Sequence, residues 1–292
     1  IKEEIEEEYL DLRYEGLPDF CPENIVQYKR ELKKILKEVN GRFPFDIVTI
    51  SCYTSFNYIN SVLLASLIKL EISPSCVILV GGVHPTICPE DFQPGNFPAC
   101  FEKLNKEEIT PFDYILQDEA EKTFFNFVKN QSFGKLRRRT SLKQACTVLE
   151  PHLLKDLAEL PLIDLSLFKK YKEVINSYNS IYLDLSRGCS FRCKYCVNSG
   201  THVKGYKKVR MRDVNTCLKE LEAIEQTPWL DIRHVSIIDM IFFIKRSARK
   251  AFFRALEKKW NNDGGFSFNI YVNDRIELCT KEDLINYKRF NI

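Results

Sequence analysis

Three cysteines lie close together in the second half of the chain, at Cys189, Cys193 and Cys196. They follow an apolar segment, residues 181–185, which is typical of a buried strand, so they fall in the loop at its carboxyl end. Ligand sites in parallel α/β folds form at that edge of the sheet. Three soft thiolates can bind three irons of a [4Fe–4S] cluster. One iron would then have no protein ligand and would be open to a reactant.

Two other interpretations of these cysteines are open. The three thiolates and His202 could bind a structural zinc ion, because a Cys3His ligand set is common for zinc. Structural zinc sites usually pair two Cys-x2-Cys segments, however, and this sequence has one. The cysteines could also be packing residues, but Arg192 and Lys194 make the loop polar, which favours exposure. These features favour the iron–sulfur cluster.

Strands and helices alternate around the cysteines and would position them. After residues 181–185, the apolar spacing predicts strands over 232–238 and 266–272 and helices over 213–225, 247–260 and 281–287. These are three βα units of a parallel sheet, which are too few to close a TIM-type barrel. We therefore expect a partial (β/α) barrel that is truncated at its carboxyl end.

The first half of the chain has the same alternation. It predicts strands over 9–14, 46–52, 76–80 and 113–116, and helices over 23–40, 58–70 and 119–129. The strands are almost uniformly apolar, as expected where helices cover both faces of a sheet. We expect a doubly wound α/β domain of the flavodoxin or Rossmann type.

Length and composition agree with two folded domains. The chain has 292 residues, and a domain has roughly 100 to 200. We assign 1–145 to the first domain and 179–292 to the second; the pattern weakens between them, over 146–178, which we assign to a linker. Hydrophobic residues make up 45% and charged residues 28%, which is typical of folded soluble proteins.

Charge, hydropathy and cysteine usage exclude several classes of protein. The 43 Lys and Arg against 40 Asp and Glu leave a net charge of +3, so we expect no nucleic-acid partner. No apolar run approaches the roughly 18 residues needed to cross a bilayer, so we expect no membrane span. The 11 cysteines are an odd number in a chain too large to need disulfides, and its start, IKEEIEEEYL, has no signal-peptide core. We expect a cytoplasmic protein.

The cysteine loop resembles that of the radical S-adenosylmethionine (radical SAM) family. The Cys-x3-Cys-x2-Cys spacing, the strand before it, the Ser-Arg-Gly lead-in at 186–188 and the aromatic Tyr195 all match that family's pattern. The resemblance implies that the free iron of the cluster binds the amino and carboxylate groups of SAM. The reduced cluster would then pass one electron to the sulfonium, giving methionine and a 5′-deoxyadenosyl radical that abstracts hydrogen from a substrate.

Two further segments of the second domain are similar to that family. VSIIDMIFF, at 235–243, resembles its second-strand segment, with Asp239 and Phe242 in matching places and Met240 where a second Asp is usual. Residues 273–278 resemble the Arg-containing end of its third strand. The resemblance implies SAM-side roles for Tyr195, Asp239 and Arg275. For the last two, a strand-end ion pair or cap is the alternative.

The first domain resembles the cobalamin-binding domain that is fused to many radical SAM enzymes. Three motifs occur in the family's order: DIVTISCYTSFN at 46–57, Gly-Gly-x-His at 81–84, and DEAE at 118–121 in place of Gly-Glu-Gly-Glu. On this likeness the segment 9–14 corresponds to the family's second strand, and its first strand would precede residue 1. The resemblance implies cobalamin contacts for Ser51, Thr54, Gly81, Gly82, His84 and Glu119. For His84, capping of the following turn is the alternative.

These resemblances imply a cytoplasmic, oxygen-sensitive radical SAM enzyme. With cobalamin bound, it would transfer a methyl group to an unreactive carbon or phosphorus centre. A low-potential donor, flavodoxin or ferredoxin, would reduce the cluster. The alternative of another class is a non-catalytic fragment that binds zinc through the three cysteines and His202 or serves in assembly. The sequence assigns no catalytic acid or base.

Overall fold

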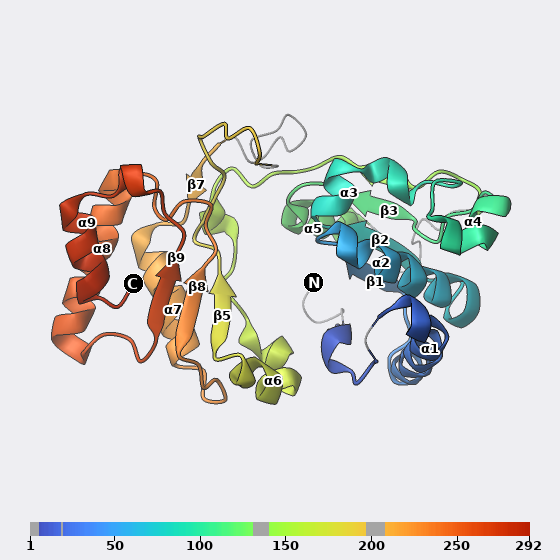
Figure 1. Cartoon of the computed structure of the whole chain (residues 1–292), viewed down its shortest axis with the longest axis horizontal. Coiled ribbons are helices and arrows are strands. Elements are labelled where there is room, and N and C mark those ends of the chain that lie inside the picture. Colours follow the sequence, from blue (N-terminus) through green and yellow to red (C-terminus); the bar gives the residue numbers. More distant parts are fainter. Residues whose placement is uncertain (1–5, 19, 131–139, 197–207) are drawn as a thin grey trace. The chain divides into compact units, whose positions relative to one another are not determined.

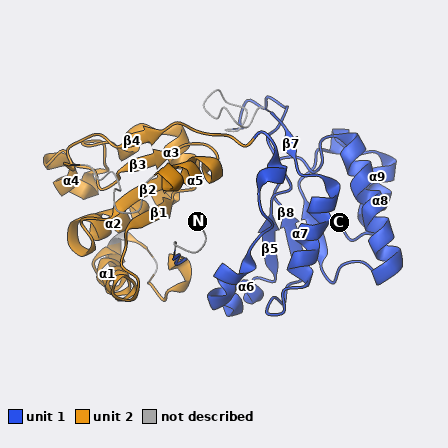
Figure 2. Cartoon of the chain, turned by 180° about the vertical axis from the view of Figure 1, so that it is seen from behind, with its two compact units in different colours: residues 1–9, 155–200, 206–292 blue, residues 10–154, 201–205 orange. Residues whose placement is uncertain are grey.

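The computed structural model describes residues 6–18, 20–130, 140–196 and 208–292. These residues form two compact units, shown in different colours in Figure 2. We call the part between residues 10 and 154 the N-terminal unit. We call residues 155–196 and 208–292, together with 6–9, the C-terminal unit. Both contain a parallel sheet, so the predicted α/β class is confirmed (Figure 1).

The N-terminal unit has a four-stranded parallel sheet. Its strands are β1 (Ile47–Ser51), β2 (Val77–Gly81), β3 (Tyr114–Leu116) and β4 (Thr147–Leu149), and they lie in that order across the sheet. The first three lie within predicted strands or one residue past them. The range 146–178, assigned to a linker from the sequence, contains β4. The described strands follow chain order, without the reversal of direction that a doubly wound sheet contains.

Helices cover both faces of this sheet. Alternate residues of β2 separate into two clusters: Ile78 and Val80 pack with α1 and α2 residues, whereas Val77 and Leu79 pack with Phe127 of α5. Burial on both faces explains why the strand is uniformly apolar. The helices of this unit are α1 (Ile25–Arg42), α2 (Ser55–Leu67), α3 (Val83–Ile87), α4 (Glu102–Lys106) and α5 (Ala120–Asn130).

Helix α1 shows how the sequence selects its buried side. Tyr28, Leu32, Leu36 and Val39 recur at spacings of three and four, and all are at least 95% buried. That stripe faces the core, and the charged residues between lie on the other side. None of the helices in the described ranges has the length and apolarity needed to cross a bilayer.

The predicted strand at Tyr9–Tyr14 is wrong. Residues Leu12–Tyr14 form a 3-10 helix, because the Asp11 carboxylate accepts hydrogen bonds from the backbone N–H of Arg13 (3.1 Å) and from its side chain. A side chain that bonds the backbone two residues ahead folds the chain into a turn. The alternating pattern Tyr-Leu-Asp-Leu-Arg-Tyr gives no sign of this bond.

The C-terminal unit has a three-stranded parallel sheet in the order β5-β8-β9 (Figure 1). Six of its elements fall where the sequence predicts them, within a few residues at each end. They are β5 (Ser180–Leu183), α7 (Val214–Glu225), β8 (His234–Ile237), α8 (Arg246–Asp263), β9 (Asn269–Val272) and α9 (Lys281–Arg289). A further helix, α6 (Lys172–Ser177), lies in the range that the sequence analysis assigned to a linker. A second, two-stranded antiparallel sheet pairs β6 (Ser186–Arg187) with β7 (Arg210–Met211).

The two faces of the β5-β8-β9 sheet differ. Val235, Ile237 and Ile270 are buried in the same cluster as residues of α7 and α8. Tyr182 and Tyr271 lie in one register row on either side of β8, and they are 65% and 53% exposed. One face therefore forms the core of the unit, and the other carries exposed aromatic side chains.

The remaining short helices are 3-10 helices at Pro22–Asn24, Pro89–Phe92, Ala99–Phe101, Leu157–Glu159, Leu165–Tyr171 and Ile276–Leu278, and a π-helical turn at Ile68–Ile72.

Candidate functional site

A buried carboxylate fixes the place where the cysteine loop begins. Asp239 lies two residues after β8 and is 1% exposed. One of its oxygens accepts hydrogen bonds from the N–H groups of Leu185 (2.8 Å) and Ser186 (2.9 Å), and the other accepts from the Ser186 hydroxyl (2.5 Å). Burial raises the pKa of Asp239 to about 6, against the lowering effect of these hydrogen bonds. Asp239 thus holds the segment between β5 and the cysteines.

The loop itself starts with a glycine in the left-handed region of backbone conformation. Gly188 has a φ of +92°, in the region that favours glycine, and directly precedes Cys189. The N–H of Cys196 donates to the carbonyl of Cys193 (3.0 Å), so the second and third cysteines lie on one turn of the chain. All three cysteines are partly exposed, and none of them forms a disulfide with another described cysteine. The loop therefore presents its sulfur atoms at the carboxyl edge of the sheet.

Arg275 reaches this loop from the end of β9. Its Nη1 lies 3.4 Å from the Cys193 sulfur, and its guanidinium lies over the Phe191 ring, 4.1 Å from the centroid. Its Nε donates to Glu277 (2.7 Å), so the guanidinium bridges the loop and the chain after β9. The structure thus brings together two residues that sequence reasoning assigned separately, Arg275 and Cys193.

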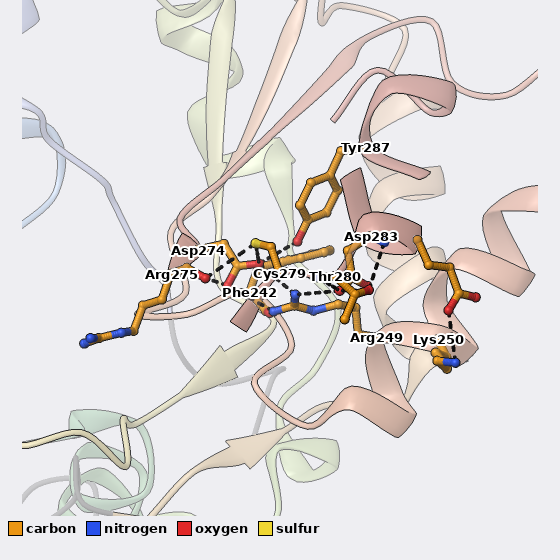
Figure 3. A network of polar contacts seen from close by, with 10 residues as sticks. Phe242, Arg249, Lys250, Asp274, Arg275, Cys279, Thr280, Asp283 and Tyr287 are labelled. Atoms are coloured by element: carbon orange, nitrogen blue, oxygen red, sulfur yellow. Dashed lines mark hydrogen bonds and ion pairs between the residues drawn. The ribbon is translucent and has the colours of Figure 1, made fainter. Parts of the chain in front are cut away.

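A buried network holds the backbone at Arg275, as Figure 3 shows. The Asp274 carboxylate accepts hydrogen bonds from the backbone N–H of Arg275 (2.8 Å), from the Tyr287 hydroxyl (2.6 Å) and from Arg249 (2.8 Å). Arg249 is 3% exposed and also donates to the Phe242 carbonyl (2.7 Å). Burial, and then the hydrogen bond to Asp274, raise the pKa of Tyr287. These contacts of Asp274 with Arg275, Tyr287 and Arg249 position the chain at the end of β9.

The chemistry of the loop's donor atoms was compared with the metal groups that the sequence suggests. In the described ranges, no three side chains of His, Cys, Asp or Glu converge on one metal position. Thiolate is the ligand that a [4Fe–4S] cluster takes, one on each of three irons, so the three cysteines fit that group by the type of their donor atoms. His202, the fourth ligand of the zinc alternative, lies outside the described residues.

Tyr195 lies apart from the contacts just described. Its side chain is 91% exposed, although it is the residue between Lys194 and Cys196 in the loop. Phe191, which sequence reasoning did not select, is the aromatic residue of the loop that Arg275 covers. An aromatic two residues before Cys193 is the signal that could have identified it.

In the N-terminal unit, the predicted cobalamin residues gather at the carboxyl ends of neighbouring strands. Ser51 ends β1 and pairs in register with Gly81 at the end of β2, which in turn pairs with Leu116 of β3. Thr54 is the N-cap residue of α2, and its hydroxyl lies 2.9 Å from the Asn57 side-chain oxygen. Ser51 and Thr54 are both exposed.

Both glycines of the Gly-Gly pair are explained by close contact within the chain. Gly82 has a φ of +116°, and a Cβ atom there would lie 2.6 Å from the carbonyl oxygen of Cys52. A Cβ on Gly81 would lie 3.3 Å from the Leu116 side chain. The resemblance implies cobalamin contacts for these glycines, but at Gly82 the backbone after β1 already lies where a Cβ would be.

His84 is held by its neighbours in the fold. Its Nε2 lies 2.9 Å from the Asp91 carboxylate in the following 3-10 helix, and its ring stacks on Tyr58 with centroids 4.7 Å apart. The side chain is 8% exposed. This geometry matches the alternative in which His84 fastens the turn that follows it.

The DEAE segment follows β3 at the same edge. Asp118 has a φ of +56°, so an aspartate takes the left-handed conformation where the resembling family has glycine. Its N–H donates to the Thr86 hydroxyl (2.9 Å), and Glu119 beside it is 7% exposed.

Tyr53 and Phe56, which sequence reasoning missed, are 67% and 94% exposed in the segment after β1. Aromatic residues directly after a strand end are the signal that could have identified them.

No family model matches this chain. Among curated proteins, it is 26% identical over 224 residues to an uncharacterized methyltransferase of Pyrococcus horikoshii, covering 74% of this chain and 43% of that protein. It is 22% identical over 210 residues to an uncharacterized methyltransferase of Synechocystis sp., covering 72% of this chain and 33% of that protein. The chain thus spans less than half the length of these relatives.

Two solved structures share the fold. One is the cobalamin-dependent SAM radical enzyme OxsB with aqua-cobalamin and SAM bound, with a TM-score of 0.58, 20% identity, and coverage of 88% of this chain and 35% of that one. The other is the radical SAM methyltransferase TsrM from Kitasatospora setae with cobalamin and a [4Fe–4S] cluster, with a TM-score of 0.61, 14% identity, and coverage of 89% and 50%. The α/β fold of the chain is therefore that of enzymes of this kind.

The explanation of Gly82 predicts a large loss of stability on adding one methyl group. Gly82→Ala should lower the free energy of unfolding by about 3 kcal/mol, because the left-handed φ and the contact with Cys52 both oppose a Cβ. Gly95→Ala is the matched control, since Gly95 also has a positive φ, +81°, but nothing within 4 Å of the added atom. It should cost about 1 kcal/mol. Equal losses in urea unfolding would disprove the contact.

The buried Asp239 predicts a stability that depends on pH. Because its pKa is raised in the folded state, the folded state binds the proton more tightly, and stability falls as pH rises from about 4 to about 6. Asp239→Asn removes this charge and keeps an oxygen acceptor. Its free energy of unfolding relative to wild type should rise across that window, by on the order of 2 to 3 kcal/mol, and then level off.

The control for this measurement is Asp213→Asn. Asp213 caps α7 and its pKa is lowered, chiefly by the Thr216 hydroxyl, so its protonation lies below that window. The difference between Asp213→Asn and wild type should be flat from pH 4 to 6. A flat difference for Asp239→Asn as well would show that Asp239 is not a buried charge.

Proposed function

We propose that this chain is the cofactor-binding part of a radical SAM enzyme that carries out cobalamin-dependent methyl transfer to an unreactive carbon or phosphorus centre. The observation that carries the proposal is the loop of Cys189, Cys193 and Cys196, with Arg275 on the Cys193 sulfur. The fold shared with OxsB and TsrM and the methyltransferase names of the relatives support it. The chain spans less than half the length of those relatives. The methyl acceptor is therefore proposed as well.

Each residue of the site has a role in the proposal. The three cysteines hold three irons, and when bound, the cluster and SAM supply one-electron cleavage of a carbon–sulfur bond. Asp239 fixes the start of the loop and, with its carboxylate used by Leu185 and Ser186, acts as a positioning residue. Arg275 donates to a ligand sulfur, and its positive charge favours the reduced, more negative state. Tyr195 is assigned to the SAM side.

The cobalamin part of the proposal uses the carboxyl edge of the N-terminal unit. Ser51 and Thr54 offer exposed hydroxyls there as hydrogen-bonding groups, and Glu119 lies after the neighbouring strand. Gly81, Gly82 and His84 shape that edge through contacts within the chain. Cobalamin supplies the methyl group when it is bound.

Two further parts of the proposal concern the cell. The odd number of cysteines, none of which forms a disulfide, fits the reducing cytoplasm. A flavodoxin or ferredoxin would deliver electrons to the exposed loop at low potential. The proposed electron transfer is tested by reducing the reconstituted chain with flavodoxin or ferredoxin.

Anaerobic reconstitution tests the site. The wild-type chain should take up about four irons per chain and, with a strong reductant, release 5′-deoxyadenosine from SAM. Cys193→Ala should lose both, because one iron has no ligand. Cys100→Ala is the matched control, since Cys100 is an exposed thiol in the other unit.

Other outcomes of this experiment decide between hypotheses. One tightly bound zinc per chain, with neither iron nor 5′-deoxyadenosine, would overturn the proposal and favour the zinc module. A chain that carries the cluster but retains no corrinoid after incubation with hydroxocobalamin would remove the cobalamin part and leave the rest standing.

The contact between Arg275 and Cys193 predicts a shift in redox potential. Arg275→Gln should lower the midpoint potential of the reconstituted cluster by on the order of tens of millivolts, because a positive charge and a hydrogen bond to sulfur are lost. Arg275→Lys keeps the charge and should shift it less. The measurement is a redox titration followed by electron paramagnetic resonance. Identical potentials in all three proteins would contradict the contact.

A further inference from the structure

A cavity of about 340 Å³ lies in the C-terminal unit, at the start of α8 and beside β7. Its charged lining residues are Lys155, Asp156, Lys208, Arg210 and Lys245. We call this cavity the basic pocket. Its volume is in the range that holds small ligands.

The charges around the basic pocket are unbalanced. Three lysines, Lys155, Lys208 and Lys245, line the pocket with one acid, and that acid, Asp156, already accepts a hydrogen bond from the N–H of Ala158 (3.0 Å). Within the described ranges, Lys155, Lys208 and Lys245 take part in no ion pair, although Lys residues elsewhere in the unit do. Cations gathered around one cavity repel one another, and an anion inside it would remove that repulsion.

The start of α8 adds to this positive field. Lys245 is its N-cap residue and makes no side-chain cap, Arg246 follows, and the first turn contains no acid. Cations at this end of an 18-residue helix oppose its dipole, so the sequence is unfavourable for the helix alone. Ala248, in the first turn, lines the pocket. An anion in the pocket would interact favourably with the helix end and with Lys245.

The walls of the basic pocket are connected to the cysteine loop. Arg210 of β7 pairs in register with Arg187 of β6, two residues before Cys189. Arg210 is itself 7% exposed, so this wall is a fixed part of the fold. α8 begins seven residues after Asp239, the carboxylate that holds Ser186 at the start of the same loop.

We propose that the basic pocket binds the phosphate group of a phosphomonoester or diphosphate, and that this group anchors the substrate beside the cysteine loop. The three lysines and Asp156 leave a net charge of +2 (3 − 1), which suits a phosphomonoester, since that group carries about −1.5 to −2 at pH 7. A carboxylate or the phosphodiester of a corrinoid carries one negative charge and compensates less of it. That the bound group belongs to the substrate rests on the proposed function. Phosphate binding by the basic pocket does not depend on it.

The test is calorimetric titration of the whole chain with inorganic phosphate and pyrophosphate, with sodium chloride keeping the ionic strength constant. We expect saturable binding that is tighter for pyrophosphate. Lys245→Gln and Lys155→Gln should each weaken it about tenfold. Lys258→Gln, on the same helix but outside the pocket, should leave it unchanged. Equal affinities in Lys245→Gln and Lys258→Gln, or no saturable binding by wild type, would overturn the proposal.

A second variant separates binding from folding. Lys245→Asp should raise the thermal midpoint without phosphate, because aspartate is a preferred N-cap, and should abolish the further rise that phosphate causes in wild type. A variant that still gains stability from phosphate would overturn the proposal.

Adenosine monophosphate and hydroxocobalamin serve as monoester and diester probes. Competition with phosphate by the monoester alone supports the proposal, and competition by the corrinoid alone overturns it. Phosphate binding by a chain that takes up no cluster would remove the proposed function and leave the pocket standing.

Discussion

The hydrogen bonds around Asp239 are the constraint on which the cysteine loop depends. A carboxylate that is 99% buried is costly, and burial accordingly raises the pKa of Asp239 to about 6. Three hydrogen-bond donors from Leu185 and Ser186 compensate for the cost of burial. Without the Asp239 carboxylate, all three donors would lose this acceptor. The bonds join the ends of β5 and β8, two adjacent parallel strands. The loop that carries the thiols therefore starts from a fixed point, although its own thiols are partly exposed.

The second fixed point comes from β9, and it too is a buried charge with several partners. Asp274 is held by Arg249 and Tyr287 and in turn binds the backbone of Arg275, whose guanidinium extends to Cys193. Buried ion pairs add little net stability, but the loss of one partner is expensive, so they favour a single arrangement. The Asp239 hydrogen bonds join β8 to β5, and the Asp274 network lies after β9, on the other side of β8. Together these two sets of contacts position the cysteine loop.

The three strands of the parallel sheet of the C-terminal unit, and α7, α8 and α9, were predictable because each follows from a local period, whereas α6, β6 and β7 were not predicted. The missed features depend on single contacts. β4 has three residues, too few to show any period, and the turn after Asp11 depends on one side-chain bond. The partners of Asp239 are 53 and 54 positions away along the chain, so the sequence could indicate its importance but not its burial. The resemblance implied a SAM-side role for Arg275, and its place near the loop agrees with the rule that the ends of parallel strands reach the same edge of a sheet.

The two glycines of the N-terminal unit lead to a different view of that edge. The resemblance implied a cobalamin contact at Gly82, whereas the backbone of Cys52 lies where a Cβ of that residue would be. Asp118, in the left-handed conformation, adds a side chain where the resembling family has none. A contact within the chain therefore accounts for the glycine at position 82. Tyr53 and Phe56 offer the largest exposed apolar area after β1, so they are the residues on which cobalamin binding would depend under the proposed function.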